Sequence, residues 1–207
     1  MRLFEITSMP LPIKSFAKLF HVGTMNVADK RNGSYEGSGL SVSLHPKEWM
    51  QIAKIGGFIW VCKRKGNKFI DFIKLSKQHK NTIAEWAIEN GFAIRTKAWR
   101  VEFYDSETDE QRYFTFADEA KAKIEADDLD TTPKLIKGAL TMTPKLSQRM
   151  NGGGSVDDLI VVAYAEDVLK IDGVWWNERL DVSALSAPRG VIVPSMIQHW
   201  TFTKIQS

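Results

Sequence analysis

The chain has 207 residues, 43% of them hydrophobic and 26% charged, with one cysteine and a formal net charge of +3. This length suits one domain that buries its core without disulfides, and a single cysteine excludes a disulfide framework and favours a reducing cytoplasm. No apolar run is long enough to span a membrane, and the mildly basic balance does not by itself predict a nucleic-acid partner.

The first half of the sequence alternates short apolar runs with turn formers and two helix patterns. In residues 45–55, Pro46 suits a first helical position and apolar residues follow at helical spacing. The run "LSVS" at 40–43 alternates apolar and polar side chains as a half-buried strand does, and Gly91 is placed to end a helix. We expect strands at 15–22, 40–43, 57–64 and 69–75, and helices at 45–55 and 76–92.

The second half predicts a hairpin, a short helix, a linker and a strand-rich end. Residues 93–116 read as two strands around the acidic loop "DSETDE", and 117–128 as a short charged helix. Two Thr-Pro pairs and a triple glycine make 132–155 linker-like. The last block, 157–205, is rich in β-branched and aromatic runs, which favours strands.

Strands at both ends, with helices and a hairpin between them, predict an α+β fold rather than an alternating βαβ chain. We expect residues 1–207 to form a single α+β domain around one mixed or antiparallel sheet, with 92–150 as a hairpin and helix insertion followed by the linker. The first and last blocks should meet in that sheet, which would contain 18–22 and a strand from 158–164 or 173–176.

Motifs of several large enzyme classes are absent from the sequence. There is no GxxxxGK[ST] phosphate loop, no GxGxxG after a strand, no HExxH, no Cys/His set with zinc spacing and no GxSxG elbow. These absences argue against P-loop NTPases, classical dehydrogenases, zinc enzymes and α/β-hydrolases, and no metal is expected. The basic runs lie in a predicted turn and on a predicted helix, where solvated charge is the usual meaning.

The stretch from residue 19 to 43 carries the strongest functional pattern. It begins with "LFHVGT", continues through a Gly-rich loop and ends in "GSGLSVS" before a predicted helix. This order resembles the front half of the ADP-ribosyltransferase fold, and the likeness is weaker over 157–205. The resemblance implies a sheet of ADP-ribosyltransferase type, NAD as substrate, and transfer of ADP-ribose to a macromolecule, with protein favoured over nucleic acid as the target.

The resemblance also implies roles for particular residues. His21 would bond the adenosine ribose, and the Gly23 backbone would bond the nicotinamide carboxamide. Arg189, in the turn "SAPRG", would either grip a phosphate bidentately or cap a surface carboxylate. A carboxylate would stabilise the oxocarbenium-like transition state, and Glu178 is the favoured candidate, with Asp172 and Asp181 as alternatives. The implied catalytic residues are Glu178 and His21. The implied NAD-binding residues are His21, Gly23, Thr24, Tyr35, Ser41, Ser43 and Arg189.

Other readings of the same residues stay open. An effector of toxin, defence or phage origin is favoured; the first alternative is a non-catalytic binding or inhibitor protein on the same fold. A third is an RNA 2′-phosphotransferase-like enzyme, which would need several basic residues to converge on a phosphate; the plausible ones are His21, Arg31, Arg179 and Arg189, so this reading ranks last. His21 also fits a core histidine. Because side chains alternate along a strand, Trp175 and Trp176 should point to opposite faces.

Overall fold

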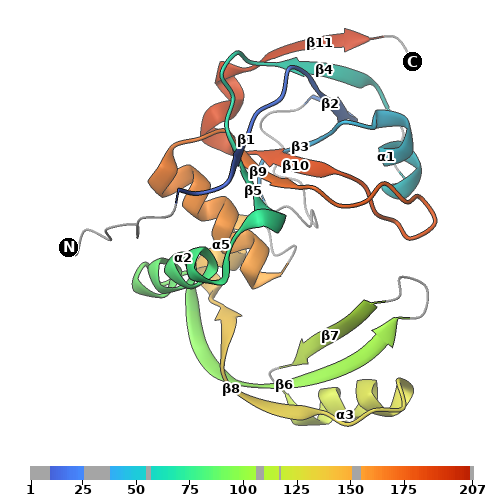
Figure 1. Cartoon of the computed structure of the whole chain (residues 1–207), viewed down its shortest axis with the longest axis vertical. Helices are drawn as coiled ribbons and strands as arrows, with labels where there is room; N and C mark the ends of the chain where they lie inside the picture. The colour runs from blue at the N-terminus through green and yellow to red at the C-terminus, as the bar shows by residue number, and fades with distance from the viewer. Residues whose placement is uncertain are drawn as a thin grey trace.

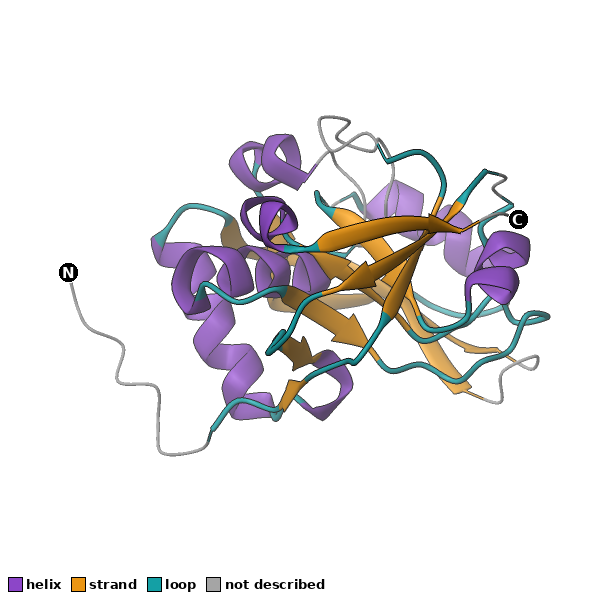
Figure 2. Cartoon of the chain, turned by 90° about the horizontal axis from the view of Figure 1, so that it is seen from above, coloured by secondary structure: helices purple, strands orange, loops and turns teal. Residues whose placement is uncertain are grey.

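An eight-stranded sheet forms the upper body of the molecule in Figure 1, and it is antiparallel except where β5 runs beside β9. The computed structural model describes residues 10–25, 38–54, 57–105, 110–116, 118–150 and 155–205. Across the sheet the strands are β1 (Ile13–Lys14), β5 (Phe69–Asp71), β9 (Gly173–Trp176), β10 (Arg189–Ile192), β3 (Leu40–Ser43), β2 (Leu19–Val22), β4 (Ile59–Lys63) and β11 (Thr201–Ile205). The sheet curls (Figure 2), and the fold is α+β as predicted.

Strands from the two ends of the chain meet at the centre of this sheet. β10 pairs with β3 on one side, placing Arg189 opposite Ser43, and with β9 on the other. The strands approach closely at Gly173, where an added Cβ would lie 1.8 Å from the Val191 carbonyl oxygen. The predicted sheet shared by the first and last blocks is therefore confirmed, and residues 173–176 supply its late strand.

Helices α2 (Lys77–Glu89) and α5 (Val156–Tyr164) cover one face of the sheet, and their apolar sides form the larger core with it. The Ser76 hydroxyl accepts a bond from the His79 N–H at the start of α2, and Gly91, with φ of 70°, follows its end. This core includes Ile83, Ala87, Leu159, Val162, Val174, Trp176 and Val191.

The opposite face of the sheet carries a second core, next to η3 (Pro194–His199). Its buried residues include Leu19, Val42, Cys62, Phe69, Trp175, Ile192 and Trp200. Trp175 belongs to this core and Trp176 to the other, so the predicted alternation of the two tryptophans is confirmed. Burial also raises the pKa of the Cys62 thiol to about 12, which makes a thiolate nucleophile unavailable at neutral pH.

A separate three-stranded sheet projects from the body, in the order β7-β6-β8. It consists of β6 (Ala93–Asp105), β7 (Glu110–Phe116) and β8 (Lys134–Met142), and α3 (Glu119–Asp128) packs on it through Ala122 and Ala126 against Val101. Figure 1 shows α2 and α5 between the two sheets. The predicted hairpin at 93–116 is confirmed by the β6–β7 pairing.

Two predictions for the second half are wrong. The predicted linker contains β8 and the helix α4 (Pro144–Met150), because the Thr-Pro pairs mark the boundaries of these elements rather than an unstructured segment. The expected strand at 158–164 is α5: the Ser155 hydroxyl caps its start by accepting a bond from the Asp158 N–H. Every residue from 159 to 164 is buried, and a uniformly apolar run cannot distinguish a buried helix from a buried strand.

The remaining elements are short. Helix α1 (Pro46–Ile52) follows β3 as predicted, whereas η1 (Phe72–Lys74) replaces the end of the strand expected at 69–75. The π-helical turn η2 (Ala165–Leu169) continues α5. Lys170 follows it with a left-handed φ of 52°. The turn brings the chain back to β9, so that the late strands return to the centre of the sheet.

Candidate functional site

The candidate site begins where strands β2 and β3 part. Among the described residues their ladder has one registered pair, Phe20 with Ser43, and beyond it the His21 imidazole enters the gap. His21 Nδ1 lies 2.8 Å from the Ser41 carbonyl oxygen, and because a carbonyl can only accept, Nδ1 carries the proton. The ring is completely buried, so this bond fixes its orientation and satisfies a carbonyl that the diverging strands would otherwise leave unpaired.

Gly23 follows β2 in a conformation that favours glycine, with φ of 122°. Its N–H donates to the Phe58 carbonyl at 2.9 Å, and its own carbonyl accepts a bond from Trp60 Nε1 at 3.0 Å. An added Cβ on Gly57 would lie 3.1 Å from the Gly23 Cα, so two glycines let the backbones cross closely here. Both polar groups of Gly23 are thus bonded within the protein. The carbonyl keeps a second lone pair, whereas the N–H would have to leave the Phe58 carbonyl to donate to a carboxamide.

The two serines of "LSVS" lie on the face opposite His21. Residues directly opposite each other in an antiparallel pair share a face, so Ser43 shares the face of Phe20, and Ser41 lies on that face too. The Ser43 hydroxyl donates to the Pro188 carbonyl at 3.0 Å and accepts a bond from the His45 N–H. Ser43 therefore ties β3 to the start of β10.

Glu178 and Arg189 form an ion pair on the serine face. Arg189 Nη1 donates to Glu178 Oε2, and the Ser186 hydroxyl lies 3.2 Å from the same oxygen. The side chains are 19% exposed for Arg189 and 31% for Glu178, so solvent reaches both. The structure brings together two predicted site residues, Glu178 and Arg189, with Arg189 directly across from Ser43.

Asp158 adds a carboxylate beside this pair that the sequence analysis did not single out. It is held by Trp176 Nε1 at 3.1 Å and by the Ser155 hydroxyl at 2.8 Å. Burial is the largest influence and raises the pKa of the Asp158 carboxyl, whereas the nearby Arg189 lowers it. The sequence did contain a signal, since the Ser155-Val-Asp-Asp158 spacing is that of a helix start.

The two alternative carboxylates have structural roles. Asp172 is 2% exposed, and its oxygens accept bonds from Arg64 Nη1, the Lys68 N–H and Trp200 Nε1. Asp181 folds an exposed turn by accepting bonds from Ser183 and the Ala184 N–H. The Ser183 hydroxyl is the largest cause of a lowered Asp181 pKa. Both arrangements favour Glu178 among the three original candidates.

The remaining predicted residues contribute less to the described geometry. Thr24 is exposed beyond Gly23, and Tyr35 and Arg31 lie outside the described residues. Trp175 and Trp176 are 0% and 4% exposed, so neither lines an open surface. The Trp175 indole N–H is buried and has no hydrogen-bond partner among the residues that the structure describes. Arg179 is exposed in the turn after β9.

Comparisons with protein-family models, curated proteins and solved structures find no match for the chain. Within the described ranges, no group of three or more His, Cys, Asp or Glu side chains is arranged to hold a metal ion. The helices in these ranges are also too short or too polar to cross a membrane.

Proposed function

We propose that the chain is an ADP-ribosyltransferase-like protein that takes NAD where strands β2 and β3 part. The observation that carries the proposal is the adjacency of three strands, β2, β3 and β10. They place His21 on β2 and Ser43 on β3, both from the front block of the resemblance, beside Arg189 on β10 from the late block, with β3 between the other two strands. His21 lies on one face and Arg189 on the other, so the bent dinucleotide would cross the gap between β2 and β3.

In this proposal His21 and Arg189 hold two adjacent parts of NAD, the adenosine ribose and the diphosphate. The Ser41 carbonyl holds the Nδ1 proton of His21, so Nε2 is the ring atom left to meet a ribose hydroxyl. Because the ring is completely buried, β2 and β3 would have to separate further for the ribose to reach it. Arg189 would bond the diphosphate, since a guanidinium matches phosphate oxygens bidentately. That exchange would separate Arg189 from Glu178 and leave an ionised carboxylate at the same place.

Glu178 would then stabilise the positive charge that develops on the ribose. In the transfer step the bond between the ribose C1′ and the nicotinamide nitrogen breaks, nicotinamide leaves with the bonding electrons, and a nucleophile of the target bonds to C1′. A fixed carboxylate stabilises the transition state more than the ground state, because C1′ carries its largest positive charge there. The target is expected to be a macromolecule, with protein favoured.

The proposal is tested by release of labelled nicotinamide from NAD, with and without cell lysate as a source of target. We expect Glu178→Gln to keep NAD binding and to lower turnover by about 10²-fold, the scale seen when one preorganised electrostatic partner is lost. Asp181→Asn is the matched control, because Asp181 lies in the same loop but only folds its turn. Equal turnover by the wild type and Glu178→Gln would overturn the role of Glu178.

A second candidate is a protein that binds through this site without turning over NAD. Two observations favour it: Arg189 already neutralises Glu178, and both backbone groups of Gly23 are engaged. A dedicated NAD enzyme would bind its substrate, and NAD at 100 times its Kd should stabilise the fold by about 2.7 kcal/mol. No shift of the melting temperature with millimolar NAD would favour the binding protein.

A further inference from the structure

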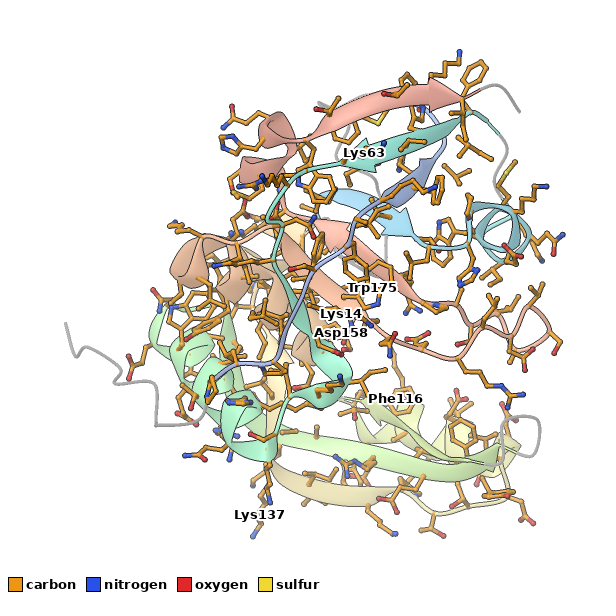
Figure 3. All side chains as sticks on the ribbon, turned by 45° about the horizontal axis from the view of Figure 1, so that its top comes forward. Lys14, Lys63, Phe116, Lys137, Asp158 and Trp175 are labelled. Carbon is orange, nitrogen blue, oxygen red and sulfur yellow. The ribbon has the colours of Figure 1, made fainter. Side chains whose placement is uncertain are left out.

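A second surface feature lies away from Gly23, at the far end of strands β2 and β4. It is an open groove of about 980 Å³ between the segment that enters β2, the turn after β4 and the start of β11. Its lining residues include Phe16, Lys63, Arg64, Lys65, Asn67 and His199. Figure 3 labels Lys63 at this end of the molecule.

A buried asparagine ties two walls of the groove together. Asn67 is 2% exposed; its Oδ1 accepts the Phe16 N–H at 2.9 Å, and its Nδ2 donates to the Phe16 and Arg64 carbonyls at 2.7 Å. The Ser15 hydroxyl donates to the Asn67 carbonyl at 2.6 Å. The segment before β2 and the turn after β4 are thus held as one unit.

A buried carboxylate ties the third wall to the same unit. Asp172 accepts bonds from Arg64 and from the Lys68 N–H in the turn, and from Trp200 Nε1 at 2.8 Å, immediately after His199. Because Asp172 is 2% exposed, it fixes the groove from beneath without offering its charge at the surface. The groove is therefore a rigid, preformed shape.

The charges presented by the groove are of one sign. Lys63 and Lys65 are exposed, and neither forms an ion pair with any residue in the described ranges. His199 adds an exposed imidazole, and no acidic side chain lines the groove. The aromatic ring of Phe16 is half-buried at its wall and packs on Trp175, with ring centroids 4.3 Å apart.

We propose that this groove binds the phosphodiester backbone of single-stranded nucleic acid. Two unpaired lysines on a rigid rim suit successive phosphates, and an open groove suits a chain that passes through better than it suits an enclosed small molecule. An aromatic ring among cationic side chains is the combination that single-strand binding surfaces use. The proposal does not rest on NAD binding, and the backbone rather than the base sequence is recognised.

The groove also has a defined relation to the candidate NAD site. Trp60 pairs with His21, and Lys63 lies three residues further along β4. At about 3.4 Å per residue, the lysine is about 10 Å from the His21 register position. A strand held in the groove would run past one end of β2 while the candidate NAD site lies at the other.

The test measures fluorescence anisotropy of labelled single strands of RNA and DNA, about 12 nucleotides long, over a series of salt concentrations. We expect wild-type binding that weakens with salt, and a loss of about tenfold or more in Lys63→Gln/Lys65→Gln at low salt. The slope of log K against log salt should become shallower by about 1.4, because each phosphate contact on a single strand contributes about 0.7.

Lys121→Gln/Lys137→Gln is the matched control, because both lysines are exposed and unpaired within the described ranges and belong to the three-stranded extension (Figure 3 labels Lys137). It removes the same charge and should leave affinity unchanged. Equal losses in both double variants, no change in the groove variant, or equal displacement by poly-glutamate would each overturn the proposal. Glu178→Gln should bind the strands like the wild type, so failure of the NAD proposal remains distinguishable.

Discussion

Two arginine–carboxylate pairs in this molecule, Arg64–Asp172 and Arg189–Glu178, differ in how far the carboxylate is enclosed and in how many bonds it accepts. The Asp172 side chain is 3% exposed and also accepts bonds from the Lys68 N–H and Trp200 Nε1. The Glu178 side chain is 31% exposed and has the Ser186 hydroxyl as its other bonded partner among the described residues. The first carboxylate is saturated and enclosed, and the second is open to solvent.

The contrast separates a structural carboxylate from one that can change partners. A buried charge without its partners pays the full desolvation cost, so Asp172 cannot release Arg64 without destabilising the fold. A half-exposed pair gains little over water, so Arg189 can leave Glu178 for a phosphate at small cost. The same contrast explains why the groove beside Asp172 is rigid, whereas the site at Glu178 is suited to exchange.

The largest expected effect is the loss of stability in Asp172→Asn. The amide keeps the shape but removes the charge that Arg64 faces, and it turns one acceptor towards the Lys68 N–H or Trp200 into a donor. We expect the free energy of unfolding to fall by about 3 kcal/mol, at the low end for breaking a buried pair because Arg64 is partly exposed. Urea denaturation measures it.

The control for this variant is Asp181→Asn, in an exposed turn. There the lost bonds exchange with water, and we expect about 0.5 kcal/mol or less for a surface substitution. If the two variants lose equal stability, the enclosed carboxylate contributes no more to the stability of the fold than an exposed one.

A slightly smaller loss is expected for His21→Ala. The ring is completely buried and its Nδ1 proton bonds the Ser41 carbonyl, so the substitution leaves both a cavity and an unpaired acceptor. We expect the free energy of unfolding to fall by about 2 kcal/mol. His21→Asn, which keeps a donor, should recover part of the loss. Thermal unfolding without NAD is the measurement, and an unchanged melting point for His21→Ala would contradict the described packing.

For Glu178→Gln we expect about 1 kcal/mol or less, because the pair it breaks is partly solvated. The comparison is sharpened by Arg189→Gln, which should cost a similar amount if the pair is the main interaction lost. A loss above about 2 kcal/mol in Glu178→Gln would mean that this pair is as structural as Arg64–Asp172. It would also weaken the idea that Arg189 exchanges Glu178 for a phosphate.

The sequence predicted the elements whose patterns are local and missed those decided by burial on all sides. "LSVS" forms β3 and Pro46 begins α1, because these signals depend on neighbouring residues alone. The strand is buried on both faces rather than half-buried as its alternation predicted, because Ser43 bonds to the Pro188 carbonyl within the protein. The run 159–164 is uniformly apolar and became a helix between the sheets, which no periodicity could show. Tertiary pairing also placed β8 where two prolines suggested a linker.

For the candidate site, the sequence identified candidate residues but not the hydrogen bonds and ion pairs that they form. His21, Glu178 and Arg189 were named from a resemblance, yet the sequence could not reveal that Arg189 neutralises Glu178 or that Gly23 is bonded on both sides. It could not separate Asp172 from Glu178 either, because both are carboxylates beside the same strand. The partners that separate them, Arg64 and Trp200, come from distant parts of the chain.

The smallest expected effect concerns Asp158, which lies between the two extremes of the comparison: it is half-buried and is held by a hydroxyl and an indole N–H. Burial raises the pKa of this carboxyl above its ordinary 3.8, so the folded state keeps the proton at a pH where the unfolded state has released it. The resulting stability is complete below the ordinary pKa and is lost as the pH rises through the folded-state value. Asp158→Asn does not titrate, so the stability of the wild type relative to this variant should fall over the pH range above the ordinary carboxyl pKa of 3.8. Urea denaturation of both proteins across this range measures the difference, and Asp157→Asn, in the same turn but exposed, controls for charge at the start of α5.

If the wild type instead gains stability relative to Asp158→Asn as the pH rises, Trp176, Ser155 and Arg189 stabilise the ionised carboxylate by more than burial penalises it. Asp158 would then belong with Asp172 among the satisfied carboxylates.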